Sequence, residues 1–289
     1  MQQNCDNRQN MSIFAVVIKN RMSTVRSWIE EMQSSGKSCF TFSEALERFP
    51  SVHPDSLKRG LTRLVSKRKI CSVWKGFYVI VPIEYQSKGI IPAVYYIDQL
   101  MKFLGRDYYV SLLSAAGFYG AAHQRPMEFT VITTPPSLRS TSKKDIKINF
   151  NNKSVILAQY TEQRKTPTSY IRISSPELTA TDLIQFEKII GGLNRASTVI
   201  YELAESCHFR KLKTDFFEYV PTPVIQRLGY LLDEELDLKK QADDLYSMAK
   251  KFSCVFRKTP LKNRKSTTDC PVNEKWGIIV NEQIEIDEL

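Results

Sequence analysis

The sequence predicts an α+β protein with a small N-terminal domain and a larger mixed α/β domain whose second half is helical. Amphipathic helices and a hairpin signal fill the first 85 residues, strand-like runs follow between residues 127 and 175, and apolar helical patterns come after them. A chain of 289 residues is long enough for two cores. We therefore expect an N-terminal extension at 1–22, a first domain at 23–85 and a second domain at 90–289.

The first domain is expected to begin with three helices. The first covers residues 23–32, with Ser23 or Thr24 as its N-cap and one apolar face. Ser43 is expected to cap the second helix. The third helix should start near Pro54, because proline suits the first helical turn.

The third helix has an unusually basic outer surface. Leu57, Leu61 and Leu64 repeat at helical spacing, so their side should face a core. The opposite side is expected to collect Arg59, Thr62, Arg63 and Ser66. Arg59 and Arg63 repel each other across one helical turn, so an external partner should supply the negative charge.

A hairpin at 70–81, turning at Lys75-Gly76, completes the element order of a winged helix-turn-helix. In a helix-turn-helix domain the recognition helix enters the major groove and basic residues meet phosphates. The net charge of +10 also favours a polyanionic partner. The side chains expected to face the bases are Arg59, Thr62, Arg63 and Ser66. Phosphate contacts are expected from Lys58, Lys67, Arg68, Lys69 and Lys75. Winged helices also serve as protein-binding modules, which remains an alternative.

The second domain is expected to combine strands with helices. Helices are expected at 93–105 and 107–120, and strands at 127–133, 146–150, 154–160 and 169–175. A helix capped by Ser175 then opens the helical half, because serine, proline and glutamate in this order favour a helix start. Further amphipathic helices follow, and the last segment again reads as extended.

Four segments of the second domain resemble a known family. They are "YYVSLLSAAGFYGAAHQRPMEFTVIT", "SPELTATDL", "RLGYLLD" and the terminal "WGIIVNEQIEID". In this order and spacing they resemble the AbiEi antitoxins, the antitoxin half of the AbiE-type (type IV) bacterial toxin–antitoxin systems. The resemblance extends from about Ser23 to the end of the chain.

The resemblance implies a function for each half of the chain. In the family, the N-terminal winged helix represses the operon shared with the toxin by binding inverted repeats in promoter DNA. The C-terminal domain counters a nucleotidyltransferase-like toxin, and a type IV mechanism does not require a stable complex of the two proteins. Such systems are linked to phage defence. The basic helix supports the DNA-binding half independently, whereas the antitoxin half depends on the resemblance alone.

The sequence offers no recognisable catalytic or metal site. Its six cysteines form no CxxC pair and it has three histidines, which argues against a zinc finger. We interpret His123 as structural. The same holds for Cys207 and His208, which are adjacent in the sequence. No partner for Asp182 or Asp233 can be identified from the sequence. We expect no enzyme activity and no cofactor. Scattered thiols without a secretory signal or a membrane span suggest a cytoplasmic protein without a membrane partner.

A second basic segment lies near the C-terminus. It could follow phosphates or RNA, or it could be a solvated loop, and it contains Arg257, Lys258, Lys262, Arg264 and Lys265. The competing function is a ligand-responsive transcriptional regulator unrelated to a toxin, whose second domain would hold a mostly apolar pocket. The operator and the number of protomers on it are left open by the sequence.

Overall fold

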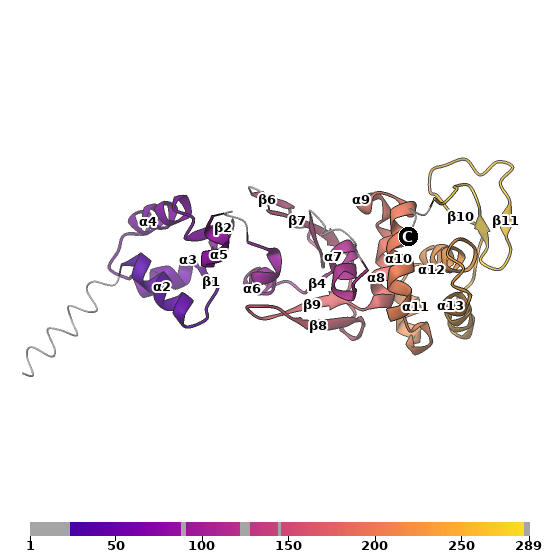
Figure 1. Ribbon diagram of the computed structural model, residues 1–289, viewed down its shortest axis with the longest axis horizontal. Coiled ribbons are helices and arrows are strands. Elements are labelled where there is room, and N and C mark those ends of the chain that lie inside the picture. Colours follow the sequence, from indigo (N-terminus) through magenta and orange to yellow (C-terminus); the bar gives the residue numbers. More distant parts are fainter. Residues whose placement is uncertain (1–23, 88–90, 122–127, 144–145, 286–289) are drawn as a thin grey trace, which may run out of the picture. The chain divides into compact units, whose positions relative to one another are not determined.

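Figure 1 shows the fold as a computed structural model, and the structure describes residues 24–87, 91–121, 128–143 and 146–285. The chain divides into two compact units. The N-terminal unit runs to Gly105 and also includes Thr141–Ile146 and Thr166–Tyr170, whereas the C-terminal unit comprises the other residues from Arg106 onward. The extension expected at 1–22 and His123 lie outside the described residues.

The N-terminal unit contains three helices and an antiparallel sheet. The helices are α2 (Val25–Ser34), α3 (Phe42–Arg48) and α4 (Pro54–Ser66). The strands are β1 (Cys39–Thr41), β2 (Ile70–Trp74) and β3 (Phe77–Ile80), in the order β1-β3-β2. The predicted hairpin is confirmed, and β1 joins it as a third strand next to β3.

Side chains fix where these helices begin. The Thr24 hydroxyl accepts a hydrogen bond from the N–H of Ser27, and α4 starts at Pro54, both as expected. His53 caps α4, because its side chain accepts from the N–H of Asp55. The prediction that Ser43 caps the second helix is wrong. Thr41 is the cap, because its hydroxyl accepts from the N–H of Glu44 while the Glu44 carboxylate accepts from the N–H of Thr41.

Both faces of this small sheet are used in packing. Phe40 and Ile70 lie in one core with Leu57 and other buried residues of the three helices. Neighbouring residues on a strand point to opposite faces. Accordingly, Phe77 of β3 does not belong to this core and contacts Phe103 instead, with ring centroids 5.4 Å apart. Phe103 belongs to α6 (Ile97–Phe103), which follows the short helices α5 (Ile83–Gln86) and η1 (Ala93–Tyr95).

The C-terminal unit is built on a mixed sheet. Five strands follow the order β7-β5-β4-β9-β8. Strand β4 pairs antiparallel with β5 and parallel with β9, and β5 pairs parallel with β7. The strands are β4 (Tyr108–Val110), β5 (Phe129–Thr133), β7 (Ile146–Asn152), β8 (Thr161–Lys165) and β9 (Tyr170–Ser174). Another strand, β6 (Thr141–Lys143), belongs to the N-terminal unit.

Two predictions for this region are wrong. The segment 107–120 is not one helix, because it opens with strand β4 and only then forms α7 (Leu112–Ala116) and the 3₁₀ turn η2 (Gly117–Tyr119). The segment 154–160 is not a strand and ends in the 3₁₀ turn η3 (Ala158–Tyr160). The strand comes directly afterwards, in the polar sequence of β8.

Helices form most of the second half, as the sequence predicts. They are α8 (Pro176–Gln185), α9 (Glu187–Ile190), α10 (Leu193–Leu203), η4 (Ala204–Ser206), η5 (Phe209–Lys211), α11 (Thr214–Tyr219), α12 (Thr222–Tyr230), the π-helical turn η6 (Leu231–Glu235) and α13 (Lys239–Lys251). A small sheet follows, made of β10 (Thr259–Pro260), β11 (Val272–Asn273) and β12 (Ile278–Ile279). The α+β class is therefore confirmed.

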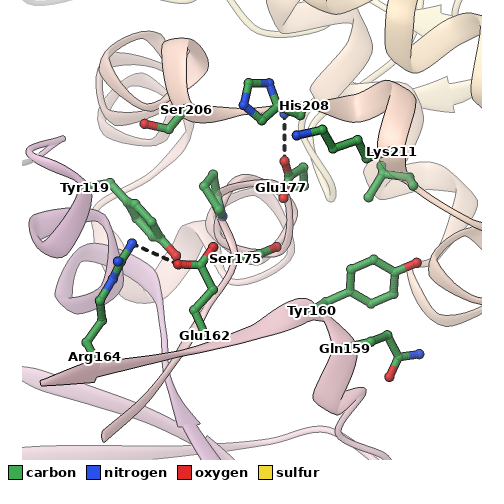
Figure 2. Close-up of a pocket in the computed structure, with 12 residues that line it drawn as sticks. Tyr119, Gln159, Tyr160, Glu162, Arg164, Ser175, Glu177, Ser206, His208 and Lys211 are labelled. Carbon is green, nitrogen blue, oxygen red and sulfur yellow. Dashed lines mark hydrogen bonds and ion pairs between the residues drawn. The ribbon is translucent and has the colours of Figure 1, made fainter. Parts of the chain in front are cut away.

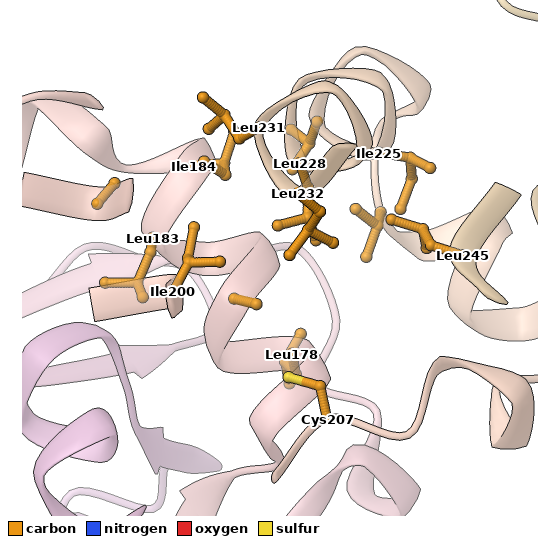
Figure 3. Close-up of a cluster of buried hydrophobic side chains, with 14 of the residues drawn as sticks. Leu178, Leu183, Ile184, Ile200, Cys207, Ile225, Leu228, Leu231, Leu232 and Leu245 are labelled. Carbon is orange, nitrogen blue, oxygen red and sulfur yellow. The ribbon is translucent and has the colours of Figure 1, made fainter. Parts of the chain in front are cut away.

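Helix α8 lies at the centre of the C-terminal unit. Its residues from Pro176 to Ile184 are all buried, so it has no solvent-facing side over this length. Figure 3 shows its leucines packed with side chains of α10, α12, η6 and α13, among them Ile200, Leu228 and Leu245. No helix among the described residues is both long and apolar enough to span a membrane.

Candidate functional site

The outer side of α4 carries the residues expected to face bases. Arg59, Thr62, Arg63 and Ser66 are all exposed, whereas Leu57, Leu61 and Leu64 on the other side are buried, as predicted. Within the described part of the chain, no acidic side chain forms an ion pair with either arginine. The hydroxyls of Thr62 and Ser66 donate to carbonyls one turn earlier, at 2.9 and 3.1 Å.

The expected phosphate-binding residues fall into two groups. Lys67 and Lys75 are exposed and have no acidic partner among the described residues, and Lys58 lies 3.9 Å from Asp55. Arg68 and Lys69 instead bind the segment after the hairpin. Arg68 donates to the carbonyl of Ser87, and Lys69 donates to the side chain of Gln86 at 2.9 Å. These two side chains would have to exchange an internal contact for a phosphate.

Part of the second basic segment is neutralised within the chain. Lys262 pairs with Glu187 at 2.8 Å and Lys265 pairs with Glu282 at 2.7 Å. The other three cations of this segment are exposed and form no ion pair with an acidic residue that the structure describes. They are Arg257, Lys258 and Arg264. A phosphate-binding role for this segment would therefore depend on three cations rather than five.

The "SPELTATDL" segment is a buried polar helix start. Ser175 caps α8 by accepting from the N–H of Leu178. The Glu177 carboxylate accepts the N–H of His208 at 2.7 Å, and the hydroxyls of Ser174 and Thr179 are 2.6 Å apart. Hydrogen-bonded groups can be buried at low cost, so this motif connects α8 to the chain around it without exposing polar groups.

Asp182 sits in a buried network at the end of the same motif. Its side chain is fully buried, pairs with Lys153 and accepts a hydrogen bond from the Tyr109 hydroxyl at 3.0 Å. The Lys153 ammonium also lies 4.7 Å from the ring centroid of Tyr219. Burial raises the pKa of the Asp182 carboxyl, and Lys153 and Tyr109 act against this rise.

A polar cavity of about 510 Å³ lies beside the start of α8 and is shown in Figure 2. Glu162 and Arg164 form an ion pair of 2.8 Å on one wall, and the Arg164 guanidinium lies 5.2 Å from the ring centroid of Tyr119. His208 belongs to the opposite wall. Its neighbour Cys207 is buried, which raises the pKa of the thiol well above its usual range. A thiol that stays protonated is a poor nucleophile, which agrees with the structural interpretation of this pair.

The "RLGYLLD" and "WGIIV" segments meet in a second buried network. The Trp276 indole N–H donates to Asp233 at 2.9 Å, and the ammonium groups of Lys239 and Lys275 lie 3.0 and 2.8 Å from the same carboxylate. Gln226 donates to the carbonyl of Trp276 at 2.7 Å. Segments that lie more than 40 residues apart are thus held by one charged cluster.

The motifs that carry the family resemblance are therefore brought together in one unit. Residues 109–234 match the family model described as "AbiEi antitoxin C-terminal domain". The chain carries an AbiEi antitoxin domain. The resemblance stated from the sequence is confirmed for these residues, and an antitoxin role in a toxin–antitoxin system is supported.

A solved structure has a similar fold over most of the chain, including this AbiEi domain. The crystal structure of the Rv2827c protein from Mycobacterium tuberculosis superposes with a TM-score of 0.61 at 15% sequence identity, covering 86% of this chain and 88% of that one. At this identity the likeness concerns the fold alone. A search of curated proteins returns no match.

The Asp233 cluster makes the stability of the AbiEi domain depend on pH. Burial by itself would raise the pKa of Asp233, but hydrogen bonds from Lys275, Trp276 and Lys239 outweigh it and lower the pKa to about 2. The unfolded state therefore binds this proton more readily than the folded state. The cluster contributes on the order of 2 kcal/mol at pH 5 and above, and the contribution disappears as the pH falls from about 4 to 2.

We expect urea denaturation at pH 5, 4 and 3 to reveal this contribution. Asp233→Asn should destabilise the domain at pH 5, and the difference from the wild type should shrink at pH 3. Asp237→Asn is the matched control, because Asp237 is exposed and forms no ion pair with a described residue. An Asp233→Asn deficit that stays constant from pH 5 to pH 3 would contradict the assignment.

The buried ion-pair partners in this domain cannot be predicted from the sequence. No partner for Asp182 or Asp233 can be identified from the sequence, whereas the structure provides Lys153 for the first and Lys275 for the second. Sequence separations of 29 and 42 residues carry no helical or strand periodicity, so they contain no local signal.

Proposed function

We propose that the chain is a DNA-binding antitoxin that represses its own operon. The N-terminal unit acts as a winged helix-turn-helix, with α4 as the recognition helix. The AbiEi domain counters a nucleotidyltransferase-like toxin encoded in the same operon, without need of a stable complex. A type IV mechanism, a role in phage defence and a cytoplasmic location are part of this proposal.

The exposed basic side of α4 is the observation that carries the DNA-binding half. Arg59 and Arg63 lie one turn apart, and no acidic residue in the described part of the structure forms an ion pair with them. Two unpaired like charges at this spacing destabilise an isolated helix slightly. DNA supplies the missing anions as phosphates and the missing acceptors as base edges, so binding converts this repulsion into attraction.

The two kinds of side chain on α4 suit two kinds of contact. A guanidinium forms two parallel hydrogen bonds with O6 and N7 of a guanine in the major groove. We assign this contact to Arg63, which is exposed, while the neighbouring Leu64 is buried and fixes which side of the helix faces outward. Lys67 and Lys75 are suited to phosphates, which need a point charge and no particular geometry.

Arg63→Ala should weaken binding to the upstream promoter fragment. If Arg63 reads a guanine, the loss is about 1–3 kcal/mol, which corresponds to roughly five- to 150-fold in affinity. Gel shifts with the promoter fragment and with a scrambled fragment, each at low and raised salt, measure the effect.

Lys37→Ala is the control for charge alone, since Lys37 is exposed and lies outside α4. It should bind nearly as tightly as the parent protein. Equal binding by Arg63→Ala and the parent across the salt series would contradict base reading by Arg63. No shift by the parent protein at low ionic strength would reject DNA binding as a whole.

A further inference from the structure

A second cavity of the C-terminal unit has more apolar walls than the first. It has a volume of about 440 Å³ and is enclosed by residues of α8, α9, α10, α12 and the segment after β10. Its apolar walls include Ile184, Phe186, Ile189, Leu193, Val224 and Leu261. The side chain of Ile189 is exposed to 45%, so this wall is in contact with solvent.

Arg227 lines this cavity and is a buried cation without a carboxylate partner among the described residues. The residue is 9% exposed. Its Nε donates to the carbonyl of Pro260 at 3.0 Å and its Nη2 donates to the Asn263 side chain at 2.7 Å. Both acceptors are neutral, and no described acid lies within ion-pair distance of the guanidinium. Burial lowers the pKa of Arg227, opposed by the more distant Glu187.

The other charges around the cavity leave the guanidinium uncompensated. Glu187 also lines the wall, but it is bound to Lys262 at 2.8 Å and is largely neutralised by it. Lys188 is exposed at the same wall and adds positive charge. A guanidinium has five N–H donors, and two hydrogen bonds to neutral acceptors leave donors for an incoming anion. A buried charge is costly unless it is paired. The binding free energy of an anionic ligand that pairs with this guanidinium should therefore be unusually favourable.

We propose that this cavity binds a small apolar monocarboxylate, an aryl or medium-chain acid, whose carboxylate pairs with Arg227. Ligand sites of this size are mostly apolar and use a few polar groups to fix orientation. One guanidinium matches one carboxylate in charge and in its two-pronged geometry. The apolar walls then cover the body of the ligand, which contributes through burial of apolar surface. The proposal does not depend on DNA binding.

Isothermal titration calorimetry with the full-length chain tests the proposal directly. The probes are octanoate and phenylacetate, and the matched controls are octanol and 2-phenylethanol, which keep the apolar body but lack the charge. We expect saturable binding of at least one acid and binding of its alcohol that is at least about tenfold weaker. No saturable binding of either acid at millimolar concentration, or equal affinity for acid and alcohol, would overturn the proposal.

Four variants show whether the charge in this cavity is responsible for acid binding. Arg227→Gln should weaken acid binding by about tenfold or more, and Arg227→Lys should retain part of it. Because Arg227 also holds the Pro260 segment, a variant at the solvent-exposed Ile189 gives a test that spares the core. Ile189→Asp should weaken acid binding by repulsion, while the similar but neutral Ile189→Asn should change it by no more than a few-fold. Unchanged affinity in both Arg227→Gln and Ile189→Asp would refute the site.

Discussion

Replacing Lys153 with methionine should lower the free energy of unfolding of the C-terminal unit by about 3–5 kcal/mol at pH 7. Methionine keeps most of the aliphatic length of lysine but removes the ammonium group. Among the described residues, the fully buried carboxylate of Asp182 would then keep only the hydrogen bond from Tyr109. A buried carboxylate that loses its cation is strongly destabilising, unlike a pair that is replaced as a whole.

The pH dependence of this loss identifies its cause. In the variant, Asp182 can avoid the buried charge by binding a proton, which at pH 7 costs about 4 kcal/mol relative to an unfolded aspartate. The folded variant would then hold a proton that the unfolded chain releases. Its stability should rise by about 1.4 kcal/mol for each pH unit between pH 7 and pH 5, so the deficit relative to wild type shrinks.

A second substitution distinguishes a lost charge pair from lost packing. Lys153→Met combined with Asp182→Asn removes both charges, so this variant should lose much less stability than the sum of the two single variants. Hydrogen exchange at the amides of α8 follows the C-terminal unit separately from the N-terminal one. A Lys153→Met deficit below about 1 kcal/mol, or one that does not change between pH 7 and pH 5, would contradict the buried pair.

Features set by local periodicity were accessible from the sequence. The buried face of α4 follows from leucines spaced by four and three residues, and the cap of α8 follows from the order of Ser175, Pro176 and Glu177. The prediction that Ser43 caps α3 is wrong, although Thr41 and Glu44 have the spacing of a capping box. Signals of this kind lie within a few residues of one another, and the helix itself brings them together.

Features set by distant pairing were not accessible. Tyr108–Val110 is buried because it pairs with β5 on one side and β9 on the other, and its apolar run alone suits a helix equally well. Strand β8 lies at an edge of the sheet, where polar side chains are tolerated, so its sequence lacks the apolar alternation of a strand. Both assignments depend on partners tens of residues away.

The same division applies to the candidate sites. The basic side of α4 could be predicted because one helix carries all of it. The cavity around Arg227 could not, because α9, α12 and the segment after β10 each contribute part of it. The unusual property of Arg227 is its burial without a carboxylate partner in the part of the chain that the structure describes. The burial of a single arginine cannot be predicted from the residues next to it in the sequence.

Replacing Gly229 with alanine should destabilise the C-terminal unit by about 3 kcal/mol or more. A Cβ atom at this position of α12 would lie 2.0 Å from Cζ3 and 2.2 Å from Cη2 of the Trp276 ring. The indole has little freedom to move away, because Asp233 holds its N–H at 2.9 Å and Gln226 holds the Trp276 carbonyl. The ring also stacks on Phe256, with centroids 5.7 Å apart. The clash outweighs the gain of about 1 kcal/mol in helix propensity.

Gly60 on α4 is the matched control for this substitution. It is also a helical glycine, but apart from its chain neighbours and its own helix backbone no described atom lies within 4 Å of a Cβ built there. Gly60→Ala should therefore stabilise the N-terminal unit by about 0.5–1 kcal/mol, the opposite sign from Gly229→Ala. Trp276→Phe removes part of the ring that the new methyl group meets, so Gly229→Ala should cost less in that background than in the wild type. If Gly229→Ala and Gly60→Ala changed stability alike in urea denaturation, the close approach of Trp276 to α12 could not be what fixes this position as glycine.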